Sequence, residues 1–380
     1  MKLPERHIQD LSDRLTHSRL CFALYRLPWT DECHLVLQAS GEAEQPAGIE
    51  ALNGKQGFVM IPFHPSESHP PVVIRPDITA FGWEEIAQAV EKAAGSLPPA
   101  EASPDIETPT ASDPSTDKDA YTAAFGRFIR PLQEKRFRKL VLSRCAAYPL
   151  CENFSPLRAF VHACNSYPRM MIYLCHTPAT GTWMGSTPEI LLSGHGQEWH
   201  TVALAGTMPL KENEEMPTAW SEKNRKEQDY VADYIRGILR KFGGKVTEKG
   251  PYTARAGQLV HLKTDFHFLL KNTDRLGELL QELHPTPAVC GLPKEEALRF
   301  IEANEGYDRR YYSGFTGWLD PEGHTDLYVN LRCMEIAGHQ ATLYAGGGIL
   351  ASSETEAEWE ETGEKMKTMK NILCSDFITK

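Results

Sequence analysis

Long apolar runs are missing from this sequence of 380 residues, and none approaches the length of a membrane-spanning helix. The N-terminus, MKLPERHIQDLSDRL, is charged and lacks the hydrophobic region of a secretory signal. Runs of lysine and arginine are absent as well, and the formal net charge of −11 argues against a nucleic-acid-binding surface. We therefore expect a soluble, cytoplasmic protein that binds neither membranes nor nucleic acids.

Motifs of several common chemistries are also missing. The nine cysteines are odd in number and contain no Cys-x-x-Cys, which favours buried thiols in a reducing compartment over disulfides or a zinc site. No two of the fourteen histidines form a His-x-x-x-His pair, which argues further against zinc. The sequence contains no P-loop, no dinucleotide-binding fingerprint and no Ser-His-Asp signature.

The residues that are present suffice for a large core, because 41% of them are hydrophobic. Residues 97–117, LPPAEASPDIETPTASDPSTD, lose nearly all large apolar side chains, which predicts a mobile linker or an exposed loop. This stretch separates an N-terminal portion, residues 1–96, from a main body at 118–380. We expect the N-terminal portion to complete the fold of the main body.

Apolar periodicity predicts both helices and strands in the main body. Residues 218–242 form the clearest helix, and 117–130 form another that Pro131 should kink or end. One continuous strand is expected at 327–336. Strands that follow one another directly, with helices between the hairpins, predict mostly antiparallel sheets covered by helices, which is an α+β layering.

The stretch from Ala345 to Thr362 combines three glycines with an acid-rich helix start. Free amide groups at Gly346 to Gly348 would form an anion site, and a carboxylate there could hold a hard cation. The plainer interpretation is a glycine turn followed by an acidic first turn, which the helix dipole favours. Glu361 and Lys365 share one helix face, which is also the spacing of an ordinary ion pair.

Four other charged residues occupy unusual places. Glu189 begins an apolar strand, where a desolvated carboxyl would have a raised pKa and could serve as a general acid. Lys139 opens the strand KLVLSR as a possible partly buried base, and Glu227 could point inward near the apolar face of its helix. Exposed positions, and for Glu227 a pair with Lys223, are the ordinary alternatives. Arg332 interrupts an apolar strand, and a charge there needs a partner or an anionic ligand.

Eight segments resemble, in order, those of the chorismate-utilising enzymes, and most closely those of the isochorismate synthases. They are KLVLSR (139–144), GSTPE (185–189), ALAGT (203–207), SEKNRKEQ (221–228), LVHLKT (259–264), YDRRYYSGFTGW (307–318), LYVNLRC (327–333) and AGGGILASSETEAEWEETGEKMKTMKNIL (345–373). The resemblance is specific as a set, since no single motif would suffice.

The resemblance implies two mainly antiparallel sheets packed together with helices outside, and an active site in a cleft between these layers. It implies a Mg²⁺ ion held by Glu227 and Glu361, with Glu358 placed to hold a water ligand, and carboxylate oxygens suit this ion. Arg332 and Lys365 would bind the carboxylates of chorismate. Further substrate-binding positions that the resemblance implies are Gly346, Gly348, Tyr312, His261, Ala205 and Gly206.

By the same resemblance, Lys139 is the general base and Glu189 is the general acid. Lys139 would draw a proton from the water that attacks ring carbon 2, and Glu189 would protonate the departing hydroxyl at carbon 4. Both groups are needed, because water is a poor nucleophile and hydroxide is a poor leaving group. The product would be isochorismate, so the expected activity is that of an isomerase.

Two positions separate the branches of this family. Relatives that add ammonia carry glutamine at the position of Lys139, and relatives that make aminodeoxychorismate carry a nucleophilic lysine at the position of Ala205. Lysine at the first position with alanine at the second therefore indicates water as the nucleophile. No glutamine amidotransferase partner is expected, and we expect a monomer.

Two alternatives stay open. Salicylate synthases share both features but go on to eliminate pyruvate, and the shortness of the chain favours isochorismate synthase over them. A non-catalytic chorismate-binding protein would have lost the base or the acid, whereas both are present. For the pathway, we expect menaquinone biosynthesis in preference to siderophore biosynthesis.

Overall fold

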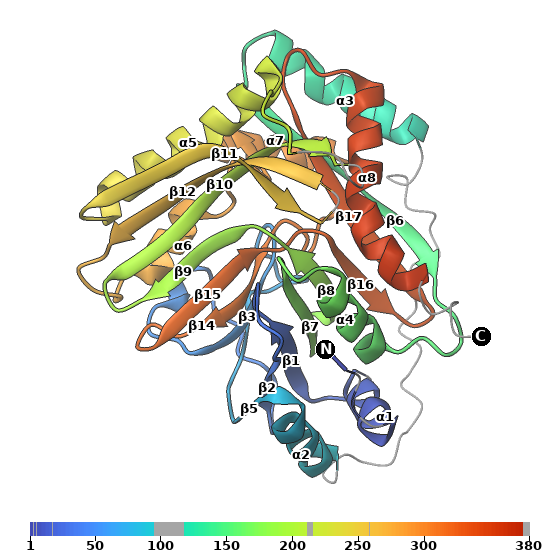
Figure 1. The fold of residues 1–380 in the computed structure, drawn as a ribbon. Coiled ribbons are helices and arrows are strands. Elements are labelled where there is room, and N and C mark those ends of the chain that lie inside the picture. The colour runs from blue at the N-terminus through green and yellow to red at the C-terminus, as the bar shows by residue number, and fades with distance from the viewer. Residues whose placement is uncertain are drawn as a thin grey trace.

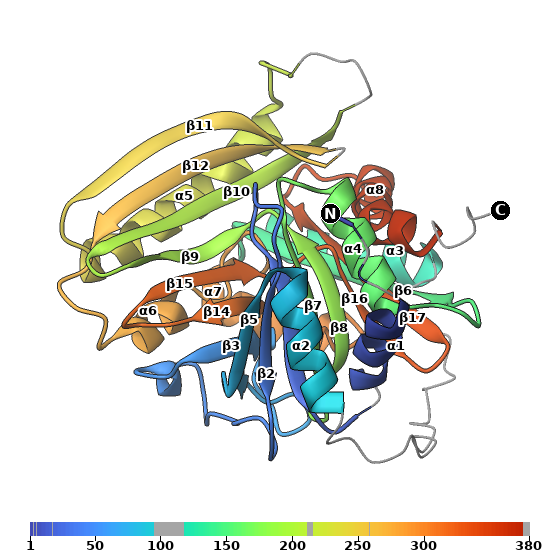
Figure 2. The same cartoon turned by 60° about the horizontal axis from the view of Figure 1, so that its bottom comes forward.

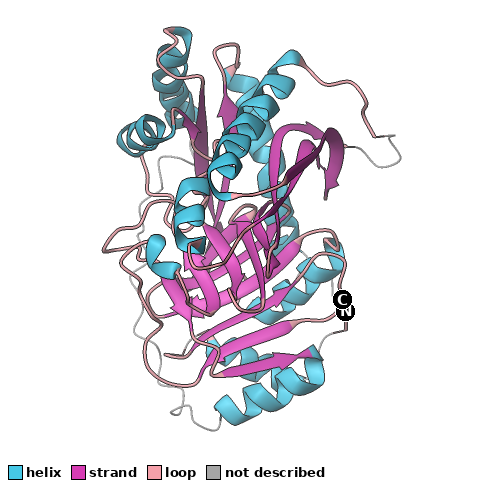
Figure 3. Cartoon of the chain, turned by 90° about the vertical axis from the view of Figure 1, so that its left-hand side faces the viewer, coloured by secondary structure: helices cyan, strands magenta, loops and turns pink. Residues whose placement is uncertain are grey.

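Two β-sheets packed together form the body of the protein in a computed structural model, which describes residues 1–94 apart from 3, 5 and 17, and then 118–210, 216–257 and 259–374. Every strand pair in both sheets is antiparallel. The helices lie outside the strands (Figures 1 and 3). The predicted fold class, with antiparallel sheets covered by helices, is therefore confirmed.

The strand order shows how distant segments meet. The first sheet runs β13 (Gly291–Leu292), β6 (Lys139–Pro149), β17 (Gln340–Ile349), β16 (Cys333–Ala337), β8 (Gly181–Thr187), β7 (Met171–Thr177), β1 (Cys21–Arg26), β2 (His34–Gln38) and β5 (Ile78–Phe81). The second runs β11 (Val246–Ala256), β12 (Leu259–Leu269), β10 (Glu198–Pro209), β9 (Ile190–His195), β15 (His324–Val329), β14 (Phe315–Leu319), β3 (Gly57–Ile61) and β4 (Val72–Ile74). Strands from the first 94 residues thus belong to both sheets.

Three apolar layers hold these elements together. Between the sheets lie aromatic residues such as Phe58, Tyr173 and Trp183. The outer face of the first sheet packs on α1 (Arg6–Leu15), α2 (Gly82–Ala94), α4 (Pro156–Ser166) and α8 (Thr355–Cys374) (Figure 2). The outer face of the second sheet packs on α5 (Glu222–Phe242), α6 (Leu276–Leu283) and the short 3₁₀ helix η1 (Glu50–Leu52). Helices α3 (Lys118–Gln133) and α7 (Lys294–Asn304) cover the part of the first sheet around β6.

The helix α5 shows how the sequence specifies an element that carries site residues. Ser221 caps its first turn, since its hydroxyl accepts a hydrogen bond from the amide of Asn224 at 3.1 Å. Val231, Ile235 and Leu239 follow at helical spacing and are buried against the second sheet. Burial of that face fixes the rotation of the helix and turns Glu227 inward, one turn before Val231.

The structure differs from two local predictions. The helix α3 continues past Pro131 to Gln133, where the lost amide affects only the last turn. Residues 327–336 do not form one strand, because β15 ends at Val329 in the second sheet and β16 begins at Cys333 in the first. Arg332 therefore lies in the crossover between the sheets, with a φ of 47°. The predicted mobile stretch 97–117 lies outside the described residues.

The glycines at 346–348 do not form a turn either. They belong to β17, in register with Ser143, Leu142 and Val141 of β6. Hydrogen-bonded pairing with β16 ends at Leu343, so the other edge of β17 is open beyond that residue. Alternate peptide groups of a strand point to alternate edges, and Lys365 reaches the carbonyl of Gly346. The peptide groups of Gly346 and Gly348 thus face this open edge.

None of the described helices is long and apolar enough to cross a membrane. The eight cysteines whose surroundings are described carry free thiols, and all of these except Cys151 are buried.

A buried ion pair ties the chain after α7 to β6. Arg309 donates two hydrogen bonds to the carboxylate of Glu305, at 2.6 and 2.7 Å, and both side chains are almost fully buried. The guanidinium also donates to the carbonyls of Val289 and Val141, while Glu305 accepts from the amide and hydroxyl of Ser143. The pair is therefore satisfied on every side, as burial of two charges requires.

Replacing Arg309 by Met should lower the free energy of unfolding by about 3–5 kcal/mol, because Glu305 would be left buried without its partner. Urea denaturation followed by circular dichroism measures this. The matched control Arg299→Met, on an exposed position of α7, should change the free energy by less than about 0.5 kcal/mol. Equal stability of the two variants would contradict the prediction.

Candidate active site

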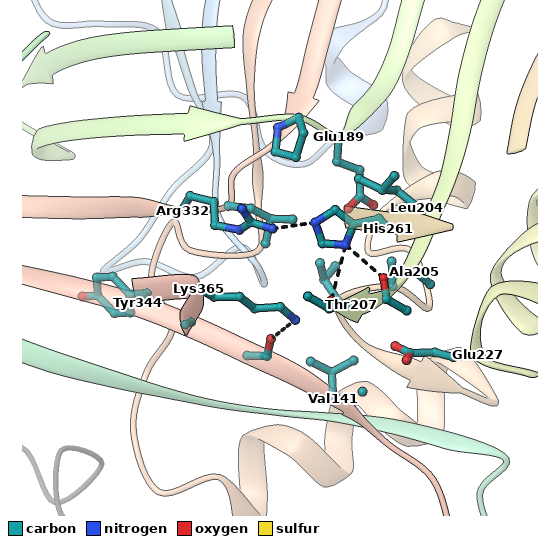
Figure 4. A pocket seen from close by; sticks show the side chains of 18 of the residues that line it. Val141, Glu189, Leu204, Ala205, Thr207, Glu227, His261, Arg332, Tyr344 and Lys365 are labelled. Carbon is teal, nitrogen blue, oxygen red and sulfur yellow. Dashed lines mark hydrogen bonds between the residues drawn. The ribbon is translucent and has the colours of Figure 1, made fainter. Parts of the chain in front are cut away.

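A cleft opens where the two sheets diverge, and it gathers side chains from both of them (Figure 4). It encloses about 590 Å³ of space, part of it open to solvent, which suits a small organic ligand. Nearly all the predicted site residues line it. These are Glu189, Ala205, Gly206, Glu227, His261, Tyr312, Arg332, Gly346, Gly348 and Lys365.

A bulge in β10 shapes one wall of the cleft. The register against β12 shifts between Ala205 and Thr207, and Gly206 between them has a φ of +68°. A Cβ at Gly206 would lie 3.0 Å from the Cβ of Asn224 on α5, so both the backbone angle and the space favour glycine. The bulge turns the Gly206 carbonyl toward His261.

His261 connects this wall to Arg332. Its Nδ1 lies 3.0 Å from the carbonyl of Gly206, and its Nε2 lies 2.9 Å from Nη2 of Arg332. Since a carbonyl only accepts and a guanidinium only donates, the pattern assigns the proton to Nδ1 and leaves the ring neutral. Burial, together with the charges of Arg332 and Lys365, lowers the pKa of His261 well below its usual value. The imidazole thus orients the arginine without adding charge.

Arg332 presents an unused hydrogen-bond donor to the cleft. Its side chain is buried, and Nη1 has no partner among the described residues. Burial lowers the pKa of Arg332 to about 10, so the guanidinium is still charged at neutral pH. A buried charge with an unused hydrogen-bond donor is unfavourable unless an anion binds to that donor. Lys365 adds a second cation to the cleft, and its ammonium donates to the carbonyl of Gly346 at 2.8 Å and to Glu361 at 2.7 Å.

Glu189 follows β8 and faces the same space, with 3% of its surface exposed. Burial raises its pKa to about 8, although the charges of Lys139, Arg332 and Lys365 act in the opposite direction. At neutral pH the carboxyl therefore carries its proton, which is the state that a general acid needs.

Lys139 and Glu227 form a second buried ion pair. The Nζ and Oε1 atoms lie 3.0 Å apart, and the lysine side chain is fully buried. Burial alone would raise the pKa of Glu227, but Lys139, Lys223 and Lys365 outweigh it, and the pKa is lowered. Lys139 is not itself among the residues that line the cleft. Lys139 lies behind Glu227 and Gly348, both of which line the cleft, and its contact with the cleft is the ion pair with Glu227.

Three carboxylates surround the glycines of β17. Glu227 lies against Gly348, whereas Glu358 and Glu361 approach Gly347 from α8. Oε2 of Glu358 is buried and has no partner in the described part of the chain. Oxygen donors of this kind suit Mg²⁺. Within the described residues, however, no three histidine, cysteine, aspartate or glutamate side chains are close enough together to hold a metal ion as they stand.

Lysines occupy the space between these carboxylates. Lys139 pairs with Glu227 and Lys365 pairs with Glu361, while the ammonium of Lys223 contacts Glu358. Burial alone would lower the pKa of Lys223, but Glu358, Glu227 and Glu361 together raise it. The sequence-based alternative that Glu227 pairs with Lys223 is wrong, because the partner of Lys223 is Glu358. Each carboxylate is thus balanced by an ammonium group.

Tyr344 and Lys223 are among the site residues that were not predicted from the sequence. Tyr344 lines the cleft and stacks on Tyr312, with ring centroids 5.5 Å apart. Its place two residues before Gly346 was a signal that could have found it. Lys223 was considered only as a partner for Glu227, and its contact with Glu358 joins segments 135 residues apart.

Comparison with known proteins points to the same family. A family described as "Chorismate binding enzyme" matches residues 75–374. The salicylate biosynthesis isochorismate synthase of Pseudomonas aeruginosa is 33% identical over 255 residues, which are 65% of this chain and 53% of that protein. Isochorismate synthase EntC of Escherichia coli is 32% identical over 210 residues, 53% of this chain and 54% of that protein. Isochorismate synthase MenF of Bacillus subtilis is 28% identical over 264 residues, 68% of this chain and 56% of that protein. The chain thus spans about half the length of these relatives.

Solved structures share the fold. The structure of MenF, the menaquinone-specific isochorismate synthase from Escherichia coli, superposes with a TM-score of 0.76 at 21% identity, covering 98% of this chain and 92% of the other. Anthranilate synthase component I from Streptococcus pneumoniae superposes with a TM-score of 0.64 at 16% identity, covering 93% and 92%.

The protonated state of Glu189 should be visible in the pH dependence of stability. The folded state binds this proton more tightly than the unfolded state, in which the pKa of the glutamate is near 4.5. The proton on Glu189 therefore contributes fully to the free energy of unfolding below pH 4.5, and this contribution is lost as the pH rises toward 8. Glu189→Gln cannot titrate. The wild type should therefore lose stability relative to the variant between pH 4.5 and 8, by up to about 1.4 kcal/mol per pH unit. Urea denaturation of both proteins across this range measures the difference, and parallel curves would show that Glu189 is ionised.

Proposed function

The chain belongs to the family of chorismate binding enzymes, and from that premise we propose that it is an isochorismate synthase. It would convert chorismate to isochorismate by adding water at ring carbon 2 and releasing the hydroxyl at carbon 4. The observation that carries the proposal is the placement of two proton-transfer groups around one cleft: Glu189, whose pKa burial raises to about 8, and Lys139, which pairs with the cleft residue Glu227.

Substrate binding follows from the cations of the cleft. Chorismate carries two carboxylates, and Nη1 of Arg332 is a buried donor without a partner among the described residues. It would donate to one of these carboxylates. Lys365 supplies a second positive charge, and the peptide groups of Gly346 and Gly348 face the open edge of β17 beside it. His261 holds the Arg332 guanidinium in place. These groups would fix the ring between Glu189 and Lys139, which removes most of the orientational freedom of the reactants.

Proton transfer is then divided between two residues. Glu189 holds a proton at neutral pH and would deliver it to the departing hydroxyl at carbon 4. Lys139 would remove a proton from the water that attacks carbon 2. The Nζ of Lys139 lies 3.0 Å from Oε1 of Glu227, so that carboxylate fixes the position of the amine behind the cleft.

We propose that Mg²⁺ is the cofactor, held by Glu227 and Glu361, with Glu358 nearby. The support is the oxygen-only donor set and the unpartnered buried Oε2 of Glu358. When bound, the ion would neutralise these carboxylates and hold a carboxylate of the substrate.

For the pathway we propose menaquinone biosynthesis. The support is the similarity over 68% of this chain to MenF of Bacillus subtilis, which shares its name with the menaquinone-specific isochorismate synthase MenF of Escherichia coli. Deletion of the gene in its source organism should then abolish menaquinone and leave siderophore secretion unchanged.

The reaction itself is tested with purified protein, chorismate and Mg²⁺, with the products separated by chromatography. Isochorismate without pyruvate is expected. Salicylate together with pyruvate would instead identify a salicylate synthase, and the absence of turnover would identify a chorismate-binding protein without activity.

Lys139→Ala and Glu189→Gln should each lower kcat by about 10²- to 10⁴-fold, because each removes one proton-transfer group. Circular dichroism should show an intact fold in both. Lys241→Ala and Glu198→Gln make the same substitutions at exposed positions and should keep the wild-type rate. A wild-type rate in either of the first two variants would overturn its assigned role.

If Glu361 is a Mg²⁺ ligand, two variants should change the affinity for Mg²⁺ in opposite directions. Glu361→Ala removes a ligand and should weaken Mg²⁺ binding at least about tenfold, together with activity. Lys223→Met removes the ammonium that now contacts Glu358 and should strengthen Mg²⁺ binding. Isothermal titration calorimetry with Mg²⁺ alone measures both. Lys226→Met, an exposed lysine on the same helix, is the control. Unchanged affinity in Glu361→Ala would rule out this ligand.

A further inference from the structure

A second cavity lies against β6, and it shares no lining residue with the catalytic cleft. Its walls come from α3, from β6 and from the turn after α7, a region where α3 and α8 lie side by side (Figure 1). The lining residues are Ala120, Tyr121, Ala124, Arg127, Ser143, Arg144, Glu305 and Gly306. The cavity encloses about 360 Å³, part of it open to solvent. Nothing in the proposed reaction uses it.

The hydroxyl of Tyr121 is the first sign of a ligand. Only 2% of this residue is exposed, and its hydroxyl has no hydrogen-bond partner in the described part of the chain. The ring packs edge-on against Trp359, with centroids 5.2 Å apart. Phenylalanine would fill the same place without leaving a buried polar atom unsatisfied. A tyrosine is better explained if its hydroxyl binds something in the cavity.

Arg144 is the second sign, because its charge is buried without a counterion. Its Nε donates to the hydroxyl of Thr362 at 2.8 Å, and its guanidinium carbon lies 3.6 Å from the ring centroid of Trp359. Among the described residues no carboxylate pairs with it. Burial lowers the pKa of Arg144, and the opposing contributions come from tyrosines and Cys145 rather than from an acid. A buried guanidinium normally has a carboxylate or another anion beside it.

Among the described residues, Glu305 is the acid that lines the cavity, and it does not pair with Arg144. Glu305 is held by Arg309 through two hydrogen bonds, and it also accepts from the amide and hydroxyl of Ser143. Arg127, exposed at the edge of the cavity, donates to the carbonyl of Asn304 and adds a second positive charge. Two arginines thus line the cavity, and the carboxylate that lines it is already paired with Arg309.

We propose that this cavity is a binding site for a small oxyanion, a carboxylate or a phosphate. The guanidinium of Arg144 offers two parallel donors of the geometry that such anions accept, and the Tyr121 hydroxyl adds a third. Arg127 attracts the anion at the entrance. The two elements joined by Arg144 and Thr362 are β6, which begins with Lys139, and α8, which carries Glu361 and Lys365. An anion bound here thus sits between the elements that support the catalytic cleft.

The test uses the full-length protein and two probes in separate titrations, inorganic phosphate and acetate, at constant ionic strength with sodium chloride as the compensating salt. Calorimetry and thermal unfolding should both show binding to the wild type. Tyr121→Phe removes only the hydroxyl and should weaken binding roughly tenfold or more while the protein stays folded. Arg144→Met should abolish binding. Arg130→Met, an exposed arginine of α3, should bind as the wild type does.

One further variant separates this site from the catalytic cleft. Arg332→Met removes the anion-binding group of the cleft and should leave the measured binding in place. Binding of phosphate alone or of acetate alone supports the site and identifies its ligand class. The proposal is overturned if neither probe binds, if Tyr121→Phe binds as tightly as the wild type, or if binding disappears in Arg332→Met.

Discussion

The ion pair between Lys139 and Glu227 is buried beside the cleft, and the arrangement of the cleft depends on it. Lys139 begins β6 of the first sheet, while Glu227 comes from α5, which packs on the second, so the pair links the two layers. Neither charge is stable there alone, because burial of a lone ion costs several kcal/mol. Gly348 leaves the necessary space, since a Cβ at that position would lie 2.0 Å from Oε1 of Glu227.

The same cleft gives two carboxyl groups opposite properties. Glu189 and Glu227 are both buried, and burial by itself would raise both pKa values. At Glu189 the surrounding positive charges are too weak to reverse this effect, so the proton stays. At Glu227 the direct contact with Lys139 and the charges of Lys223 and Lys365 reverse it. Within one site, Glu189 thus stays protonated and Glu227 stays ionised, because Glu227 directly contacts a lysine.

Much of the fold was predictable because local signals agreed with the tertiary outcome. The spacing of Val231, Ile235 and Leu239 is enough to indicate α5, although the expected start at residue 218 lies before the Ser221 cap, after which the helix begins. The failure at 327–336 has a tertiary cause: the segment around Arg332 is as apolar as a strand, but its two halves pair with different sheets. The hydrophobic periodicity of a segment does not indicate which other strand it will pair with. The glycines at 346–348 were misplaced because pairing with β6 outweighs their low strand propensity.

By itself, the sequence determined the order of the motifs, the residue types at the site and the family, because these depend only on the identity and order of residues along the chain. The tertiary structure alone decided which charges meet. It placed Lys223 against Glu358 and set the tautomer of His261 through Gly206 and Arg332. Within the described residues, it also left Arg144 without a carboxylate and the Tyr121 hydroxyl without a partner. Desolvation and Coulomb interactions act between neighbours in space, and here those neighbours come from segments far apart in sequence.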